Sequence, residues 1–175
     1  MSLLAQAIRT SVPEGPLGYP PVRVNIQGAD GVGKSTFAAN SDDVIFLQAE
    51  DGLKYIEAAR LPVAMVWQDL LDQVKALAND AHEYKTLCLD TTDAASILAE
   101  RHVCEKNDWE SIETPGFGKG QVKVKEAWVR ILDGLQVCHD IRKMNIILLS
   151  HVAVKPFNDA IHEVYDRWEM RCHKQ

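Results

Sequence analysis

Residues 28–35 read Gly28-Ala29-Asp30-Gly31-Val32-Gly33-Lys34-Ser35 and fit the pattern G-x-x-x-x-G-K-[S/T] in full. An apolar run at residues 22–26 precedes them, and a helix is predicted over residues 34–40. The glycines let the backbone curl so that successive N–H groups point inward, and the helix that follows adds the positive end of its dipole. This context predicts a strand, a phosphate-binding loop (P-loop) and a helix that together hold a nucleoside triphosphate.

Each polar residue of the loop has an expected partner. Lys34 should reach the β- and γ-phosphates, and the Ser35 hydroxyl should bind Mg²⁺. GTPases recognise guanine with an N-K-x-D element, which does not occur in this sequence, so the expected cofactors are ATP and Mg²⁺. The predicted nucleotide-binding residues are Gly28, Ala29, Asp30, Gly31, Val32, Gly33, Lys34, Ser35 and Thr36.

Composition predicts one globular domain and excludes a membrane protein. The 175 residues are 46% hydrophobic and 25% charged, and no apolar run approaches the roughly 18 residues of a membrane span. Proline-rich residues 1–20 lack the features of a secretory signal and are expected to form a flexible arm that leads into a domain at 21–175. The four cysteines are well separated, which favours a reducing, cytoplasmic compartment. The formal net charge of −6 does not decide whether the chain binds nucleic acid, because local clusters of Lys and Arg matter more.

Hydrophobic periodicity predicts strands that alternate with helices. Such alternation is typical of an α/β protein with a mostly parallel sheet covered by helices on both faces. A long loop is expected where Pro115 and three glycines lie among polar residues. The expected strands lie at 44–47, 63–66, 86–90 and 145–150, the helices at 53–60, 70–78, 93–106 and 124–143, and the loop at 107–121.

Two acids follow predicted strands, where open α/β sheets bind ligands. Asp90 ends the strand at 86–90, where a Mg²⁺-binding Walker B aspartate is expected, although it could instead cap the next helix. Glu50 follows the strand at 44–47 and is a candidate for activating water. The alternative for Glu50 is a solvated acid, and its neighbour Asp51 competes for the same role.

In this order, the motifs resemble those of phage RecA-like P-loop ATPases, which are AAA-type nucleotide-binding proteins of the Sak-type single-strand annealing recombinase group. The resemblance covers most of residues 22–168. It implies a three-layer P-loop NTPase of RecA-like (ASCE) type. The motifs that carry it are residues 28–36 followed by Phe37-Ala38, Phe46-x-x-x-Glu50-x-Gly52, Leu89-Asp90-Thr91, Gly116-Phe117-Gly118-Lys119-Gly120, Ser150-His151, Lys155-x-Phe157 and Tyr165-Asp166-Arg167.

The resemblance also implies roles for single residues. Lys34 would bind phosphate, Ser35 and Asp90 would hold Mg²⁺, and Glu50 would be the general base. His151 would sense the γ-phosphate and relay its presence to a DNA-binding loop, although RecA itself uses glutamine there. A hydrogen-bonded histidine at a strand end is the simpler alternative for His151.

The implied function is Mg²⁺-dependent ATP hydrolysis in phage DNA recombination or single-strand annealing, in the cytoplasm of the bacterial host, by a phage or prophage protein. Single-stranded DNA is expected to contact residues 107–125, where Lys119, Lys123 and Lys125 could bind phosphates and Trp109 or Phe117 could stack on a base. An ordinary solvated loop is the alternative there.

The other implied partners are single-strand binding protein and further copies of the chain, with Lys155 and Arg167 facing a neighbouring subunit's ATP. The family generally continues past the point where this chain ends, so a C-terminally truncated or minimal form that lacks the last strands is expected.

Two other functions are compatible with the P-loop. A nucleotide or metabolite kinase would need an arginine-rich lid, but the arginines at 101, 130 and 142 are scattered. A non-hydrolysing, ATP-gated DNA-binding module would not need Glu50 to act as a base.

Overall fold

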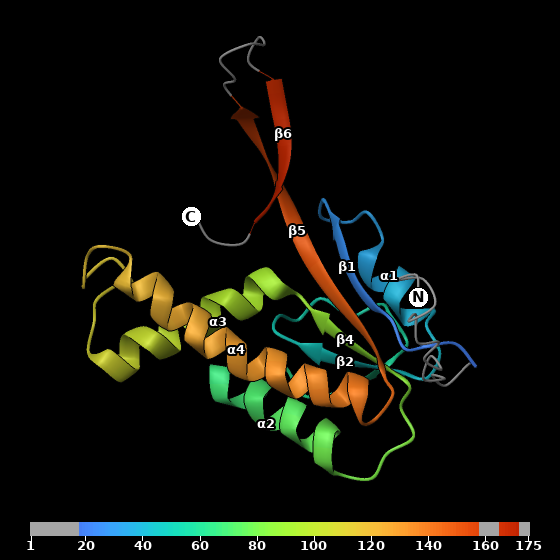
Figure 1. Cartoon of the computed structure of the whole chain (residues 1–175). Coiled ribbons are helices and arrows are strands. Elements are labelled where there is room, and N and C mark those ends of the chain that lie inside the picture. Colours follow the sequence, from blue (N-terminus) through green and yellow to red (C-terminus); the bar gives the residue numbers. More distant parts are fainter. Residues whose placement is uncertain (1–17, 158–164, 172–175) are drawn as a thin grey trace, which may run out of the picture.

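The computed structural model describes residues 18–157 and 165–171, so almost all of the arm predicted at residues 1–20 lies outside the described residues (Figure 1). The strands are β1 (Arg23–Gly28), β2 (Val44–Gln48), β3 (Ala59–Arg60), β4 (Thr86–Asp90), β5 (Asn145–Phe157) and β6 (Tyr165–Met170). The helices are α1 (Lys34–Ala39), α2 (Trp67–Asn79), α3 (Thr92–Asn107) and α4 (Lys119–Asp140).

The sheet has the order β1-β5-β4-β2-β3, and all four of these pairings are parallel. Because side chains of a strand alternate between its two faces, the central strands contribute to two separate cores. In β2, for example, Ile45 and Leu47 belong to the larger core, whereas Val44 and Phe46 belong to the smaller one. The larger core lies under α2, α3 and α4, and the smaller one includes Ala38 of α1. The chain therefore has the three-layer α/β fold of P-loop NTPases, as predicted.

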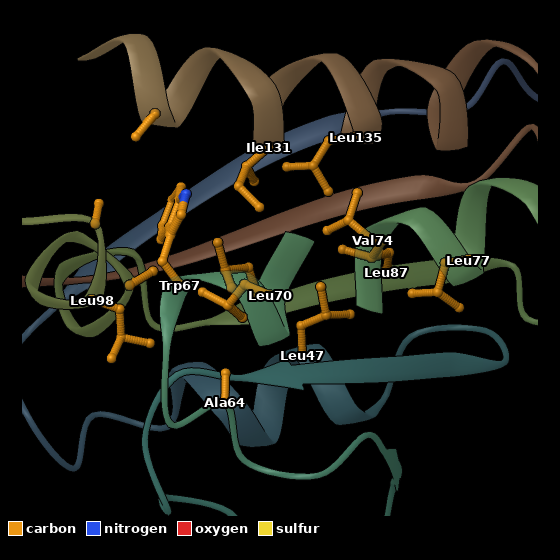
Figure 2. Packing of buried hydrophobic residues seen from close by; sticks show 14 of the residues in the cluster. Leu47, Ala64, Trp67, Leu70, Val74, Leu77, Leu87, Leu98, Ile131 and Leu135 are labelled. Carbon is orange, nitrogen blue, oxygen red and sulfur yellow. The ribbon is translucent and has the colours of Figure 1, made fainter. Parts of the chain in front are cut away.

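The larger core is built around α2 and α4, which pack on each other as well as on the sheet (Figure 2). Trp67 and Trp128 meet edge to face there, with ring centroids 5.4 Å apart. Gly134 lets the two helices approach closely, because a Cβ at this position would lie 2.4 Å from Val74 Cγ1. Among the residues that the structure describes, no helix combines the length and the apolar character needed to cross a membrane.

The segment between β2 and α2 differs from the prediction of a helix at 53–60 and a strand at 63–66. Residues 53–58 are not helical, and the short strand β3 lies at Ala59–Arg60. β3 and the residues after it lie along the outer edge of β2, whose carbonyls need donors. Leu61 N donates to Phe46 O at 2.9 Å and Ala64 N donates to Gln48 O at 2.8 Å, which holds the segment extended beside β2.

The long loop predicted at 107–121 is shorter, because α4 begins at Lys119 rather than near residue 124. Gly118 precedes the helix with φ 70°, a conformation that glycine adopts without strain. Gly120 then packs directly on the loop backbone, where a Cβ would lie 1.9 Å from Ile112 O. The first turn of α4 packs through backbone contacts of glycine rather than through apolar side chains. The pattern of apolar residues in the sequence therefore did not reveal it.

β5 continues beyond the sheet as one arm of a hairpin. Its outer half pairs antiparallel with β6, from Val152 opposite Met170 to Phe157 opposite Tyr165. Figure 1 shows this hairpin projecting well past the ends of the other strands. The sequence predicted only the part of β5 that lies within the sheet.

β1 lies at the edge of the sheet and, among the described residues, pairs only with β5. Ile146 N donates to Val22 O at 2.9 Å, so the backbone groups of every second residue from Val22 point towards β5. Those of Arg23, Asn25 and Gln27 point outward. Within residues 18–157 and 165–171, the strand that carries the P-loop thus has one unpaired edge.

Candidate active site

The parallel register brings three motifs together at the carboxyl ends of the strands. Gly28, which begins the P-loop, lies opposite His151, the last residue of β5 that pairs with β1. Asp90 lies opposite Leu149 on one side and Gln48 on the other. The loop, the predicted Walker B acid, the predicted sensor and the residues after β2 therefore share one edge of the sheet.

The P-loop has the left-handed backbone that its glycines allow. Gly31 has φ 73° and Gly33 has φ 95°, and Gly33 is the residue before α1. Lys34 is 7% exposed, and its Nζ donates to Gly28 O at 3.1 Å and to Ala29 O at 2.9 Å. The ammonium group is therefore held at the loop that would cradle the phosphates.

Ser35 and Asp90 meet at the centre of the site. Ser35 Oγ donates to Asp90 Oδ2 at 2.7 Å, and Asp90 is 4% exposed. Burial raises the pKa of Asp90, whereas the Ser35 hydrogen bond and the positive charges of His151 and Lys34 oppose the rise. A hydroxyl and a carboxylate are hard oxygen ligands of the kind that Mg²⁺ takes beside the phosphates of a nucleotide. The Ser35 hydroxyl and the Asp90 carboxylate are thus suitable ligands for Mg²⁺.

Glu50 lies beside this pair. Thr91 Oγ1 donates to Glu50 Oε1 at 2.9 Å, and Ala49 N donates to Asp90 O at 2.8 Å, which ties the end of β2 to the end of β4. The competitor Asp51 is exposed and forms an ion pair of 3.1 Å with Lys54. The geometry therefore favours Glu50 over Asp51 as the acid of the site.

His151 is bracketed by two carboxylates. Its backbone N donates to Asp93 Oδ1 at 3.0 Å, and its ring Nδ1 lies 2.7 Å from Asp93 Oδ2. Its Nε2 lies 2.8 Å from Asp30 Oδ1, in the P-loop. Partial burial alone would raise the pKa of Asp93, but the hydrogen bonds from His151 lower it overall.

Two residues of the site were missed from the sequence. Asp93 orients His151 and Thr91 orients Glu50, and both follow Asp90 closely in the chain. Their partners His151 and Glu50 are 58 and 41 residues away, so although Thr91 stands in the Leu89-Asp90-Thr91 motif, the sequence did not show which residue either one contacts. Their position just after a Walker B acid was the available signal.

A cavity of about 680 Å³ opens beside the acids and His151. It reaches from Asp30 and Glu50 along the start of α3 to Lys155 and Arg171 of the hairpin. Lys155 Nζ lies 2.8 Å from Glu169 Oε2, and Arg167 Nε donates to Glu169 Oε1 at 3.0 Å. Of these two basic residues, predicted to face a neighbour's ATP, Lys155 also lines the cavity.

The segment predicted to contact DNA is not part of this site. α3 starts beside Asp90 and has 16 residues, which places its far end about 24 Å away. The loop that follows α3 lies at that far end (Figure 1). Phe117 is fully exposed there, but Trp109 packs against the larger core and Lys123 pairs with Glu126 at 2.8 Å. Lys119, Lys123 and Lys125 lie on α4 rather than in the loop.

The whole arrangement agrees with what comparison with known proteins finds. A family model described as an AAA domain matches residues 20–175. The chain is also 27% identical, over 154 residues, to the SPbeta prophage-derived uncharacterized protein YorG of Bacillus subtilis (strain 168). That match covers 85% of this chain and 45% of YorG, so the chain spans about half the length of this relative. The chain therefore belongs to the AAA domain family and carries a P-loop of the nucleotide-binding type.

Proposed function

We propose that this protein binds ATP together with Mg²⁺ and hydrolyses it. The observation that carries the proposal is the 2.7 Å contact between Ser35 of the P-loop and the buried Asp90. These residues come from motifs 55 positions apart, yet their oxygens lie close enough to share one ion. Glu50, hydrogen-bonded to Thr91, completes the set with an acid that can accept a proton.

Each residue has a defined part in the proposed reaction. Lys34 balances the negative charge of the β- and γ-phosphates, and Ser35 and Asp90 hold Mg²⁺, directly or through water. Mg²⁺ supplies neutralisation of the charge that develops on the phosphate oxygens. Glu50 accepts a proton from the water that attacks the γ-phosphorus, and the bond to the β–γ bridging oxygen breaks to release ADP and phosphate. Thr91 keeps the Glu50 carboxylate in one orientation through its 2.9 Å hydrogen bond.

We further propose a role in phage DNA recombination or single-strand annealing, in the cytoplasm of the bacterial host. The prophage origin of YorG supports the phage context. Single-stranded DNA would contact residues 107–125 through the exposed Phe117 ring and the basic residues at the start of α4. Single-strand binding protein and further copies of this chain are the other proposed partners, with Lys155 and Arg167 completing a neighbour's site.

The test is Mg²⁺-dependent ATP hydrolysis by the purified chain, with and without single-stranded DNA. Lys34→Ala should abolish both ATP binding and turnover, whereas Lys54→Ala, which removes an exposed lysine, should leave both unchanged. Glu50→Gln should retain ATP binding and lose turnover. A folded sample that binds ATP but never hydrolyses it, with or without DNA, would refute the enzymatic part and favour the ATP-gated module.

The DNA contact has its own test. Phe117→Ala should weaken binding to single-stranded DNA by about 1–3 kcal/mol if a base stacks on the ring. Lys119→Ala should reduce the dependence of affinity on salt, and Lys75→Ala on α2 is the matched control. Equal affinities of all these variants and the parent would remove the loop from the DNA-binding surface.

The cavity beside the site favours kinase activity as a second candidate. Its volume of about 680 Å³ leaves room for a small acceptor next to the γ-phosphate, and Lys155 and Arg171 could bind an anionic group there, although the acids Asp30, Glu50, Asp93 and Glu100 line the same cavity. Transfer of label from γ-labelled ATP to a nucleoside monophosphate would establish this activity. Label recovered only as inorganic phosphate would exclude that acceptor.

A further inference from the structure

The contact between the P-loop and His151 is a feature that the proposed hydrolysis does not explain. Asp30 Oδ1 lies 2.8 Å from His151 Nε2, and Asp93 Oδ2 lies 2.7 Å from Nδ1. An ionised carboxylate can only accept hydrogen bonds, and a neutral imidazole carries one N–H. Each ring nitrogen of His151 therefore faces a carboxylate oxygen, and an N–H at Nε2 can be given either to Asp30 or to another anion.

The two carboxylates hold the ring very differently. The Asp93 side chain is 13% exposed, and it binds both the ring and the backbone N–H of His151. The Asp30 side chain is 70% exposed, and of His151 it contacts the ring nitrogen Nε2 and not the backbone, with a longer approach of 4.0 Å to Arg171 Nη1. Asp93 is therefore the fixed partner that orients the ring, whereas Asp30 can leave with little rearrangement.

Asp30 lies where a triphosphate would bring its own negative charge. It belongs to the loop whose backbone would cradle the phosphates, and it lines the same cavity as Glu50 and His151. A γ-phosphate bound between Lys34 and Glu50 would approach both the Asp30 carboxylate and His151 Nε2. The phosphate oxygens and Asp30 would then compete for one proton.

We propose that Asp30 is a specificity-determining residue that occupies His151 Nε2 in the absence of a γ-phosphate and thereby lowers the affinity for ATP relative to ADP. ADP lacks the competing group and leaves the Asp30–His151 contact in place. ATP must displace Asp30, and His151 Nε2 then donates to the γ-phosphate while Asp93 keeps hold of Nδ1. This role rests on the proposed function.

Displacement of Asp30 also changes a contact with the hairpin. Arg171, the residue after β6, has Nη1 4.0 Å from Asp30 Oδ2, and its backbone N donates to His151 O at 2.8 Å. His151 itself lies where β5 leaves the sheet for the hairpin. Displacement of Asp30 from His151 would therefore also change the contact of Asp30 with Arg171 at the base of the hairpin.

Asp30→Asn tests the proposal because it removes the charge and keeps the size of the side chain. Affinities for Mg²⁺-ATPγS and Mg²⁺-ADP would be measured with fluorescent analogues. We expect Asp30→Asn to bind ATPγS about 5- to 10-fold more tightly than the parent, within the usual range of coupling between sites, and ADP within about twofold. Asp133→Asn on α4 removes an equal charge from an exposed helix position and should leave both affinities unchanged.

A double-mutant cycle with His151→Ala shows whether Asp30 acts through His151. We expect the gain from Asp30→Asn to disappear when His151 is absent, whereas simple repulsion between Asp30 and phosphate would persist. A persistent gain, or an ATPγS-to-ADP ratio within about twofold of the parent's in Asp30→Asn, would overturn the role of Asp30 and leave the proposed function intact. A folded parent that binds neither nucleotide would refute the proposed function, and the role of Asp30 with it.

Discussion

Ser35→Ala removes the hydroxyl that satisfies the buried Asp90 carboxylate, and it should destabilise the protein even without nucleotide. Ser35 Oγ donates to Asp90 Oδ2 at 2.7 Å, and Asp90 is 4% exposed. The carboxylate loses this donor at a position where little water can replace it. A residue expected to act only on Mg²⁺ therefore also contributes to the free energy of unfolding.

The size of the effect follows from the type of hydrogen bond. A hydrogen bond to a charged group contributes about 1.5–3 kcal/mol, and because Ser35 is only partly buried we expect the lower part of that range, about 1.5–2 kcal/mol. For a chain of this length, each kcal/mol corresponds to about 2–4 °C in Tm, so the expected decrease is roughly 3–8 °C.

The effect should depend on pH with a defined sign. Burial raises the folded-state pKa of Asp90 above its ordinary value of 3.8. An acid with a raised pKa contributes most to stability when it is protonated, below its ordinary pKa, and that contribution is lost as pH rises through the folded-state value. Ser35→Ala should raise the folded-state pKa further, so its cost should be full at pH 7 and small where Asp90 is protonated.

The assay is urea unfolding followed by tryptophan fluorescence, with EDTA and without nucleotide, for the parent, Ser35→Ala, Asp90→Asn and the double variant. We expect a coupling energy of about 1.5–2 kcal/mol between the two positions at pH 7. Asp90→Asn alone should lack the pH dependence assigned to Asp90. A coupling energy below about 0.5 kcal/mol, within the error of such cycles, would refute the reasoning.

Four further results are expected. Gly33→Ala should cost about 1–2 kcal/mol in urea unfolding because φ is 95° there, and Gly33→Asn should cost clearly less because asparagine tolerates this region; equal costs would contradict the argument. Gly134→Ala should cost about 1–3 kcal/mol through its 2.4 Å clash, and Val74→Ala should relieve part of that cost, unless the helices shift apart freely. Burial raises the pKa of the Cys88 thiol well above its ordinary value, so this thiol should react with a thiol reagent only as fast as the protein unfolds. Rapid labelling of Cys88 in the native state would contradict this prediction. The outward-facing amides of β1 should exchange with deuterium faster than its inward-facing ones, and equal protection would mean that the edge is covered.

The sequence predicted the parts of the site that depend on local rules. The P-loop is a contiguous motif, and Asp90 and Glu50 each follow an apolar strand, so the parallel sheet alone brings them to one edge. The pairing of Asp93 with His151 depends on how α3 packs beside β5. No pattern within either segment encodes that contact across 58 residues.

The sequence predicted the strands and helices whose apolar residues follow their buried positions. It missed the elements in which the pattern of apolar residues does not follow burial. β2 and β4 are fully buried apolar runs, and α2 has a clear apolar stripe. β6 was missed because four of its six residues are exposed, so no face of the strand is consistently apolar. The helix predicted at 53–60 was wrong, and its last two residues pair with β2 instead, in a segment whose Leu61 N and Ala64 N satisfy Phe46 O and Gln48 O.

Because one edge of β1 is unpaired among the described residues, a partner that binds along this edge would affect how mobile the P-loop is. Gly28 begins the loop at the end of a strand that is hydrogen-bonded along one side within the described part of the chain. A strand added along the outward-facing groups of Arg23, Asn25 and Gln27 would restrict the motion of β1 and order the loop before ATP arrives. Ordering a binding loop in advance lowers the entropic cost of binding, so such a partner would tighten nucleotide affinity without touching a phosphate.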